Sequence, residues 1–252
     1  MSLYQHFARI YSAGPYTTYS QNMAELLPGV LARYQAPGGG QLLDIACGEG
    51  TFAVAAARQG WQVSGVDQSA DMLALARERA TQSGLEIELQ QVDMRQLDFD
   101  SRFDLATCWY DSLNYILKGD DLQLVFQRVA RALKPRGWFI FDMNTLYGLA
   151  VVWQRQPSYV EQESADLMEI HENAFDYEQQ IASQRIIAYT RKGELWERME
   201  EIHQERSYPL SSVDEWLKQA GFELVACLGD LRQDKSPEIS SPRVWYILRK
   251  GN

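Results

Sequence analysis

The sequence predicts an α/β protein with a doubly wound, mostly parallel sheet, and three observations lead to this prediction. Strand-like apolar runs alternate with helical patterns from about residue 41 to residue 143, which is the period of βαβ units. A glycine-rich turn joins the first apolar run to the first helical pattern. A helix, a strand, a loop and a strand follow over residues 213–249. The 252 residues allow one large domain or two small ones.

Each element of the alternating region has its own sequence signal. An alanine-rich run and two amphipathic patterns predict helices, of which the second begins at the capping residue Ser69. The strands are short apolar or alternating runs, and Lys134-Pro135-Arg136-Gly137 is a stop signal after the third helix. The predicted strands are 41–46, 62–66, 86–92, 103–109 and 138–143, and the helices are 52–59, 69–83 and 120–133.

The pattern changes between residues 159 and 208, where strand-like stretches follow one another without core helices. The stretches are 168–177, 181–191 and 195–207, with a hairpin turn at 192–194. They predict an antiparallel sheet inserted before the last elements. These are a helix at 213–220, strands at 222–229 and 244–249, and a polar loop at 230–242 between them.

Composition and charge restrict the class of partner. Hydrophobic residues make up 46% of the chain and charged residues 23%, as in soluble globular proteins. The net charge of −10 argues against nucleic acid and anionic membranes, and it favours a small-molecule or protein partner. The three cysteines form no CxxC pair, and no apolar run suits a signal peptide or a membrane span. We therefore expect reduced thiols and a cytoplasmic protein.

The glycine-rich turn carries the strongest chemical signal. Gly48 and Gly50 allow the backbone to approach a ligand closely, and a helix N-terminus follows them. Asp67 ends the next predicted strand, 19 residues after Gly48, where a carboxylate suits the two hydroxyls of a ribose. Together with Ala53 the glycines satisfy G-x-G-x-x-[G/A], which fits NAD as well as S-adenosylmethionine.

Three further features separate these two ligands. Asp44 precedes the glycines, where a carboxylate would crowd a pyrophosphate but helps to hold an ammonium group. Asp93 ends the third strand and suits an adenine amino group, with Met94 against the ring. The last elements do not form a second nucleotide-binding half. All three favour S-adenosylmethionine.

The motifs in combination resemble those of the class I S-adenosylmethionine-dependent methyltransferases. DIACGEG is similar to their first motif, VSGVDQS to their second, VDMRQL to their adenine-binding motif, and LKPRGWFIFD to the segment leading into their fifth strand, with Arg136 where glycine is more usual. The resemblance covers about residues 41–143 and, more loosely, the tail. It implies a Rossmann-like, seven-stranded sheet whose last strand is antiparallel, S-adenosylmethionine as cofactor and S-adenosylhomocysteine as product. The implied domains are an N-terminal helical cap at 1–40, a methyltransferase core at 41–150 and 209–252, and an inserted sheet at 151–208.

The resemblance also implies a set of cofactor-binding residues. Asp44 and the turn backbone would flank the methionine moiety, Asp67 would hold the ribose hydroxyls, and Asp93 would bind the adenine N6. The remaining residues would lie beside the turn, the adenosine or the sulfonium, or would close the site from the N-terminal helix. These are Tyr19, Ala46, Cys47, Gly48, Gly50, Gln68, Met72, Met94, Cys108 and Trp109.

An acceptor pocket is expected where the fourth and fifth strands end, because ligands bind at the carboxyl ends of strands in such sheets. Candidate catalytic residues are Tyr110, Asp111 and Asn144 there, and Tyr11 in the N-terminal segment. Structural alternatives stay open: Asp111 as a helix cap, Asn144 as a turn residue, and the tyrosines, like Trp109 and Tyr115, as packing groups.

The three histidines give weaker indications of a functional role than the residues above. His6 would lie near the cofactor, whereas His171 and His203 fall in the inserted sheet, and a lone histidine is more often structural. The sequence shows no metal-binding pattern.

The inserted sheet is similar in placement to that of sugar N,N-dimethyltransferases, and the fourth-strand segment is similar to that of glycine and sarcosine N-methyltransferases. These resemblances imply methyl transfer to a small molecule, at nitrogen more than at oxygen. They also imply a sheet that covers the active site or forms a homodimer. Two alternatives stay open: a non-catalytic, S-adenosylmethionine-binding regulatory module and an NAD-dependent oxidoreductase.

Overall fold

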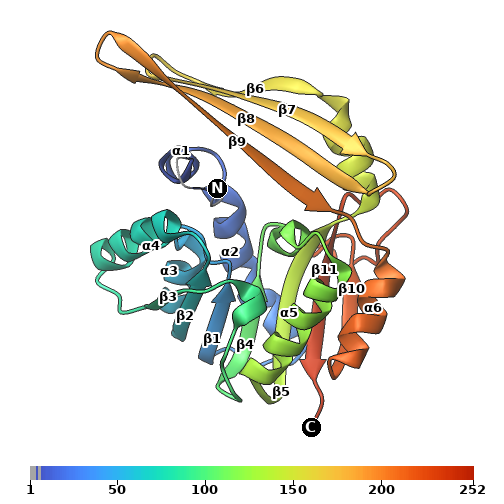
Figure 1. Cartoon of the computed structure of the whole chain (residues 1–252). Helices are drawn as coiled ribbons and strands as arrows, with labels where there is room; N and C mark the ends of the chain where they lie inside the picture. The colour runs from blue at the N-terminus through green and yellow to red at the C-terminus, as the bar shows by residue number, and fades with distance from the viewer. Residues whose placement is uncertain (1–3, 5–6) are drawn as a thin grey trace.

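The computed structural model describes residue 4 and residues 7–252, and its main body is a seven-stranded sheet (Figure 1). The strand order is β10-β11-β5-β4-β1-β2-β3, in which β11 runs antiparallel to both neighbours and the other pairs are parallel. The strands are β1 Gly40–Ile45, β2 Trp61–Asp67, β3 Glu88–Gln91, β4 Phe103–Cys108, β5 Leu133–Asn144, β10 Phe222–Leu228 and β11 Arg243–Lys250. The predicted fold class is confirmed.

Helices cover both faces of this sheet because its central strands are apolar on both sides. On one face, Leu27 and Phe52 from α2 (Thr17–Arg33) and α3 (Thr51–Arg58) pack with Leu42 and Ile140. On the other face, α5 (Gly119–Ala132) and α6 (Leu210–Gln219) pack against Leu43, Phe141 and their neighbours. No helix in the described part of the chain is long and apolar enough to cross a membrane.

The helix start predicted at Ser69 is confirmed, and two other boundaries differ from the prediction. The Ser69 hydroxyl accepts a hydrogen bond from the backbone N–H of Met72 at 3.3 Å, at the start of α4 (Ala70–Gln82). Helix α5 ends at Ala132, as the stop signal at residues 134–137 predicts, but these residues already belong to β5, where Arg136 has a φ of 61° and the register with β4 shifts. Helix α6 begins at Leu210, directly after Pro209.

The inserted sheet has four antiparallel strands in the order β6-β7-β8-β9. They are β6 Ser158–Glu163, β7 Leu167–Asp176, β8 Ile181–Lys192 and β9 Leu195–Arg206, so the three predicted strands are joined by a fourth, β6. The short turns η3 (Gly148–Val152) and η4 (Trp153–Arg155) lead into the sheet. Figure 1 shows it lying across the carboxyl ends of the central strands.

The N-terminal segment, which comprises Tyr4 and residues 7–19, lies between the two sheets (Figure 1). Phe7 and Ile10, which lies in α1 (Ala8–Ala13), pack with Ile186 and Ala188 of β8. The backbone N–H groups of Tyr4 and Phe7 both donate to the Glu201 carboxylate of β9. The segment is therefore held against the inserted sheet and covers the end of the main sheet.

We expect the substitution Gly50→Ala to destabilise the fold more than Gly84→Ala does. Both glycines have a positive φ, of 84° and 65°, so alanine is strained at either position and costs about 1–2 kcal/mol. At Gly50 the added Cβ would also lie 3.0 Å from the Cβ of Ala76, whereas nothing lies within 4 Å at Gly84. Urea unfolding should show the Gly50 variant to be less stable than the Gly84 variant by about 1–3 kcal/mol. Equal losses would mean that this close approach to α4 has no energetic role.

Candidate active site

A cavity of about 510 Å³ opens at the carboxyl ends of β1, β2 and β4, beneath the N-terminal segment and the inserted sheet. Its position is the switch point of the sheet, where ligands bind in doubly wound folds. Most of the predicted site residues line it, namely Tyr11, Asp44, Ala46, Cys47, Gly48, Asp67, Gln68, Met72, Asp93, Met94, Trp109, Tyr110 and Asp111. Tyr19, Gly50, Cys108 and Asn144 are not part of this lining.

The glycine-rich turn is tied to the end of β2 through Asp67. The Gly48 N–H donates to Asp67 Oδ2 at 2.9 Å, and the Ser69 N–H donates to Asp67 Oδ1 at 2.8 Å. Burial nonetheless raises the pKa of this carboxyl above its ordinary value. The turn and Asp67 thus face the cavity in a fixed geometry, at the place where the sequence predicts a ribose contact.

Asp44 is a buried carboxyl with one oxygen that has no partner. The Thr107 hydroxyl donates to Oδ1 at 3.1 Å, whereas Oδ2 accepts no hydrogen bond from the described residues. Burial, with smaller contributions from Asp67 and Glu49, raises the pKa of Asp44 to about 8. A cationic ligand at this oxygen would satisfy it and would favour the ionised form.

Asp93 differs from Asp44 because it already has a cationic neighbour. The Arg95 guanidinium donates to both carboxylate oxygens of Asp93, and this pairing lowers the pKa of Asp93. The Asp93 side chain also accepts the backbone N–H of Arg95 at 2.9 Å, at the start of η1 (Met94–Gln96). A contact from Asp93 to an adenine amino group stays a prediction.

The backbone after β4 turns sharply and is held by Asp142 of β5. Tyr110 and Asp111 have φ values of 58° and 53°, in the left-handed region that non-glycine residues seldom adopt. The Asp142 carboxylate accepts both of their N–H groups, at 2.7 and 3.0 Å, and is paired with the guanidinium of Arg243. The same guanidinium donates to Asp111 Oδ2 at 2.7 Å. Asp111 precedes η2 (Ser112–Tyr115), but its side chain does not cap it.

Asn144 is the last residue of β5 and joins two carboxyl groups. Its Nδ2 donates to Asp111 Oδ2 at 2.6 Å and to Glu205 Oε2 of β9 at 2.8 Å, and its backbone N–H donates to Asn114. Asn144 is therefore a strand residue that links the main sheet to the inserted sheet. It is not the turn residue that the sequence left as an alternative.

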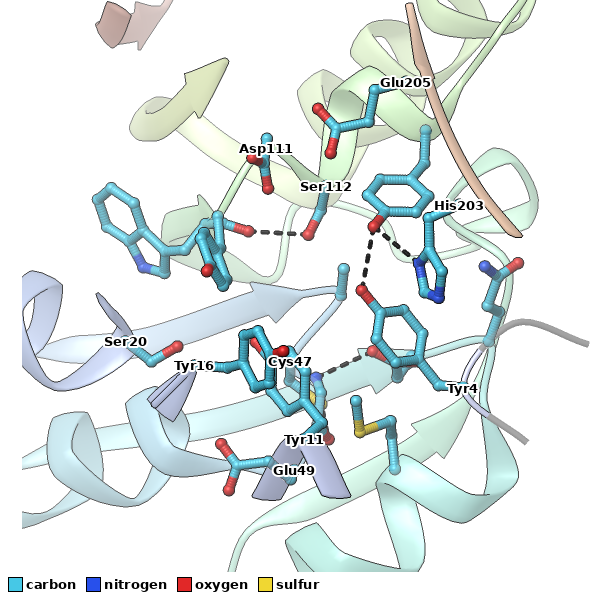
Figure 2. A pocket seen from close by; sticks show the side chains of 18 of the residues that line it. Tyr4, Tyr11, Tyr16, Ser20, Cys47, Glu49, Asp111, Ser112, His203 and Glu205 are labelled. Carbon is cyan, nitrogen blue, oxygen red and sulfur yellow. Dashed lines mark hydrogen bonds between the residues drawn. The ribbon is translucent and has the colours of Figure 1, made fainter. Parts of the chain in front are cut away.

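Tyrosines from the N-terminal segment form stacked pairs beside the cavity. Tyr19 stacks on Tyr110 with 4.7 Å between ring centroids, and the Arg243 guanidinium lies 4.9 Å from the Tyr19 ring centroid. Tyr11 and Tyr16 stack at 4.8 Å and both line the cavity. Tyr19 thus supports the cavity residue Tyr110. Tyr11 contributes directly to the cavity wall, as Figure 2 shows.

Both histidines of the inserted sheet line the cavity. The two ring nitrogens of His171 bond to Glu169 and Tyr159, at 2.6 and 3.1 Å. Nδ1 of His203 shares a hydrogen bond of 3.0 Å with the Tyr115 hydroxyl, which lies 3.2 Å from that of Tyr4. His6, the third histidine, lies outside the described residues. Within residues 4 and 7–252 no three His, Cys, Asp or Glu side chains gather as metal ligands.

Several residues of the cavity and its wall were absent from the sequence-based candidates. They come from the N-terminus, the end of β5, the inserted sheet and β11, and they are Tyr4, Asp142, Glu205 and Arg243. One signal was present for Glu205, since Glu201, His203 and Glu205 alternate with a period of two along a strand and so share a face. Nothing in the sequence indicated that this face meets the end of β4.

Comparison with known proteins adds independent findings. A family model described as "Methyltransferase domain" matches residues 42–137. The Bacillus subtilis (strain 168) protein named "Putative methyltransferase YqeM" is 31% identical over 265 residues, which cover 99% of this chain and 98% of that protein. A solved S-adenosylmethionine-dependent methyltransferase from Clostridium acetobutylicum ATCC 824 superposes with a TM-score of 0.83 at 27% identity, and each chain is fully covered.

A third similarity covers about half of each chain. The dTDP-3-amino-3,6-dideoxy-alpha-D-glucopyranose N,N-dimethyltransferase of Streptomyces fradiae is 32% identical over 148 residues, which are 52% of this chain and 56% of that protein.

The raised pKa of Asp44 predicts that stability without ligand falls as pH rises. Below pH 8 the folded state keeps a proton on Asp44 that the unfolded chain, with its ordinary pKa near 4, has already lost. The free energy of unfolding should therefore decrease between about pH 4 and pH 8, and Asp44→Asn should remove this part of the slope. Urea unfolding at pH 5.5 and pH 8 measures it. If the free energy of unfolding changes with pH in Asp44→Asn as it does in the intact protein, the pKa of Asp44 is not raised.

Removal of Asp142 should be costly because it leaves Arg243 with one partner fewer and frees the Tyr110–Asp111 turn. We expect Asp142→Ala to lower the free energy of unfolding by about 3–5 kcal/mol, as for other broken buried pairs. The matched change Asp98→Ala removes an exposed partner of Arg131 and should cost less than about 1 kcal/mol. Denaturant unfolding of both variants tests the contrast, and a loss below about 1 kcal/mol at Asp142 would refute it.

Proposed function

Since the chain belongs to the class I S-adenosylmethionine-dependent methyltransferases, we propose that it methylates a nitrogen atom of a small molecule. The family membership sets aside the NAD-dependent oxidoreductase that the glycine pattern alone had left open. The acceptor and the roles of the individual residues are our proposal. The homodimer and the cytoplasmic location expected from the sequence stay predictions.

The observation that carries the assignment of the cofactor end is the unpartnered Oδ2 of Asp44. This oxygen lies in the cavity wall beside the glycine-rich turn, and the ammonium group of a methionine moiety suits it. Asp67 would meet the ribose, and Gln68, Met72, Asp93 and Met94 would surround the adenosine. The hydrogen-bonding groups of these residues therefore suit the successive parts of S-adenosylmethionine, and so does their order along the chain.

S-adenosylmethionine supplies a methyl group that its sulfonium already activates. The protein has to align an acceptor with that methyl group and keep water away from both. Tyr11 and Tyr110 form aromatic walls for the acceptor, and Asp111 and Asn144 hold the strand ends on which this part of the cavity is built. The N-terminal segment and the inserted sheet exclude water by covering the cavity.

The charges of the cavity favour an amine as the acceptor. Among the described residues, the guanidinium groups that line it are those of Arg95 and Arg243, and both are ion-paired. Glu161 and Glu205 add acidic groups at the acceptor end. Among the lining residues that the structure describes, an anionic acceptor would meet no unpaired guanidinium, whereas an amine would meet carboxyl groups and tyrosine rings. The Streptomyces fradiae relative, by its name, dimethylates an amino group of a sugar.

Calorimetry with S-adenosylmethionine and S-adenosylhomocysteine tests the cofactor site. We expect both to bind, and Asp67→Asn to weaken both by at least tenfold, about 1.4 kcal/mol, because the ribose contact is lost. Asp71→Asn, an exposed position in the first turn of α4, is the matched control and should leave both affinities unchanged. Failure of both compounds to bind the intact protein would overturn the proposal.

Transfer from isotope-labelled S-adenosylmethionine tests the acceptor class. The protein is incubated with a protein-free extract of bacterial metabolites and, separately, with intact RNA, and mass spectrometry locates the label. We expect label on nitrogen in the small-molecule fraction and none on RNA. Label on oxygen or on RNA would refute the acceptor class. Cofactor binding without transfer to any fraction would favour a non-catalytic module.

A further inference from the structure

Glu205 lies at the acceptor end of the cavity and is supplied by the inserted sheet. It belongs to the face of β9 that also carries Glu201 and His203, and it is 2% exposed although it lines the cavity. Figure 2 shows its carboxyl group directed toward Asp111 and Ser112. Its Oε2 accepts the hydrogen bond from Asn144, and no other described side chain donates to this carboxyl.

The charges around Glu205 do not balance. Three buried carboxyl groups, those of Asp111, Asp142 and Glu205, share one guanidinium, that of Arg243. Arg243 contacts the two aspartates and not Glu205. Burial, followed by the charge of Asp111, raises the pKa of Glu205 well above its ordinary value. Three carboxyl groups beside one guanidinium leave the site short of positive charge, and Glu205 is the carboxyl without a cationic partner.

The other titratable groups that face Glu205 do not supply this charge. Tyr4, Tyr110 and Tyr115 all interact with it, and burial raises the pKa of each phenol above its ordinary value. They are neutral at physiological pH and offer hydroxyl groups and ring faces. A cation that enters the cavity at this end would be attracted by Glu205 and would pack against aromatic rings.

His203 provides a second, independent indication that a polar ligand belongs here. Its Nε2 is buried and has no hydrogen-bond partner among the described residues, while Nδ1 is bonded to Tyr115. The Glu201 carboxylate lies 3.4 Å from Nε2 without forming a hydrogen bond to it. A buried ring nitrogen without a partner is costly, so a ligand group at this place would be stabilising.

We propose that Glu205 binds the acceptor nitrogen and takes the proton that this nitrogen loses. The inference rests on the proposed N-methyltransferase function and narrows its substrate to primary or secondary amines. The acceptor reacts as the neutral amine, because an ammonium nitrogen has no lone pair. This lone pair forms the new bond to the methyl carbon as the methyl–sulfur bond breaks and its electron pair stays on sulfur. The alkylated nitrogen then carries one proton too many, and this proton passes to the Glu205 carboxylate. Glu205 is therefore a catalytic residue contributed by the insertion.

Sinefungin tests this proposal without knowledge of the acceptor, because it carries an ammonium group where S-adenosylmethionine carries its methylsulfonium. Its affinity is compared with that of S-adenosylhomocysteine, which lacks this charge but shares the α-amino group near Asp44. The ratio of the two affinities thus cancels the contribution of Asp44 and reports on carboxylates near the reacting methyl position.

We expect calorimetry to show that the intact protein prefers sinefungin and that Glu205→Gln reduces this preference by about tenfold, because an ammonium group beside Glu205 favours its ionised form and glutamine cannot ionise. The control Glu197→Gln, an exposed position on the same strand, should keep the preference. In the intact protein the preference should also grow as the pH rises, because Glu205 loses its proton, and this measurement needs no variant.

The outcomes separate the two proposals. If neither compound binds the intact protein, the cofactor assignment itself is wrong. If both bind but the preference is the same in the intact protein and in Glu205→Gln and does not change with pH, Glu205 does not hold the acceptor nitrogen, and the proposed methyltransferase function is unaffected.

Discussion

The buried carboxylate of Asp142 is the interaction on which the rest of this site depends. It accepts the N–H groups of Tyr110 and Asp111 and binds Arg243, so it connects β5 to the end of β4 and to β11. Two successive left-handed residues are unfavourable by themselves and persist only where the surrounding structure holds them. With the turn held, Tyr110 faces the cavity and Asp111 reaches Arg243 and Asn144.

The cavity has two ends with different origins. The end that we propose binds the cofactor is built by the chain immediately after β1 and β2, where the turn and Asp67 are bonded to each other. The proposed acceptor end is built by segments that pack on this core, because α1 is joined to β8 by apolar contacts and the backbone N–H of Tyr4 donates to Glu201. A change in the N-terminal segment or in the inserted sheet should therefore alter the acceptor end first.

Much of the fold follows from local sequence, and so does the part of the cavity that surrounds the glycine-rich turn. Periodicity separates helices from strands, and the glycine turn lies beside Asp44 and Asp67 because the carboxyl ends of β1 and β2 are neighbours in any doubly wound sheet. The predicted helix stop at residues 134–137 is confirmed, because α5 ends at Ala132, but the following strand begins earlier than predicted, since Leu133 already pairs with Phe103 of β4. The role of Asp111 as a helix cap was equally plausible locally, but Arg243 and Asn144 engage its side chain instead.

The sequence by itself determined the order of the elements, the seven-stranded arrangement implied by its motifs, and most of the residues that line the cavity beside the glycine-rich turn, because these depend on neighbours in the chain. Only the tertiary structure decided which side chains meet at the acceptor end. Asp111 and Arg243 are 132 residues apart, and Asn144 and Glu205 are 61 apart. Such contacts leave no periodic trace in a single sequence, since they arise where an inserted sheet and the last strand converge on the end of β4. The surplus acid implied by the net charge of −10 includes Glu205, whose lack of a cationic partner appears only in the folded chain.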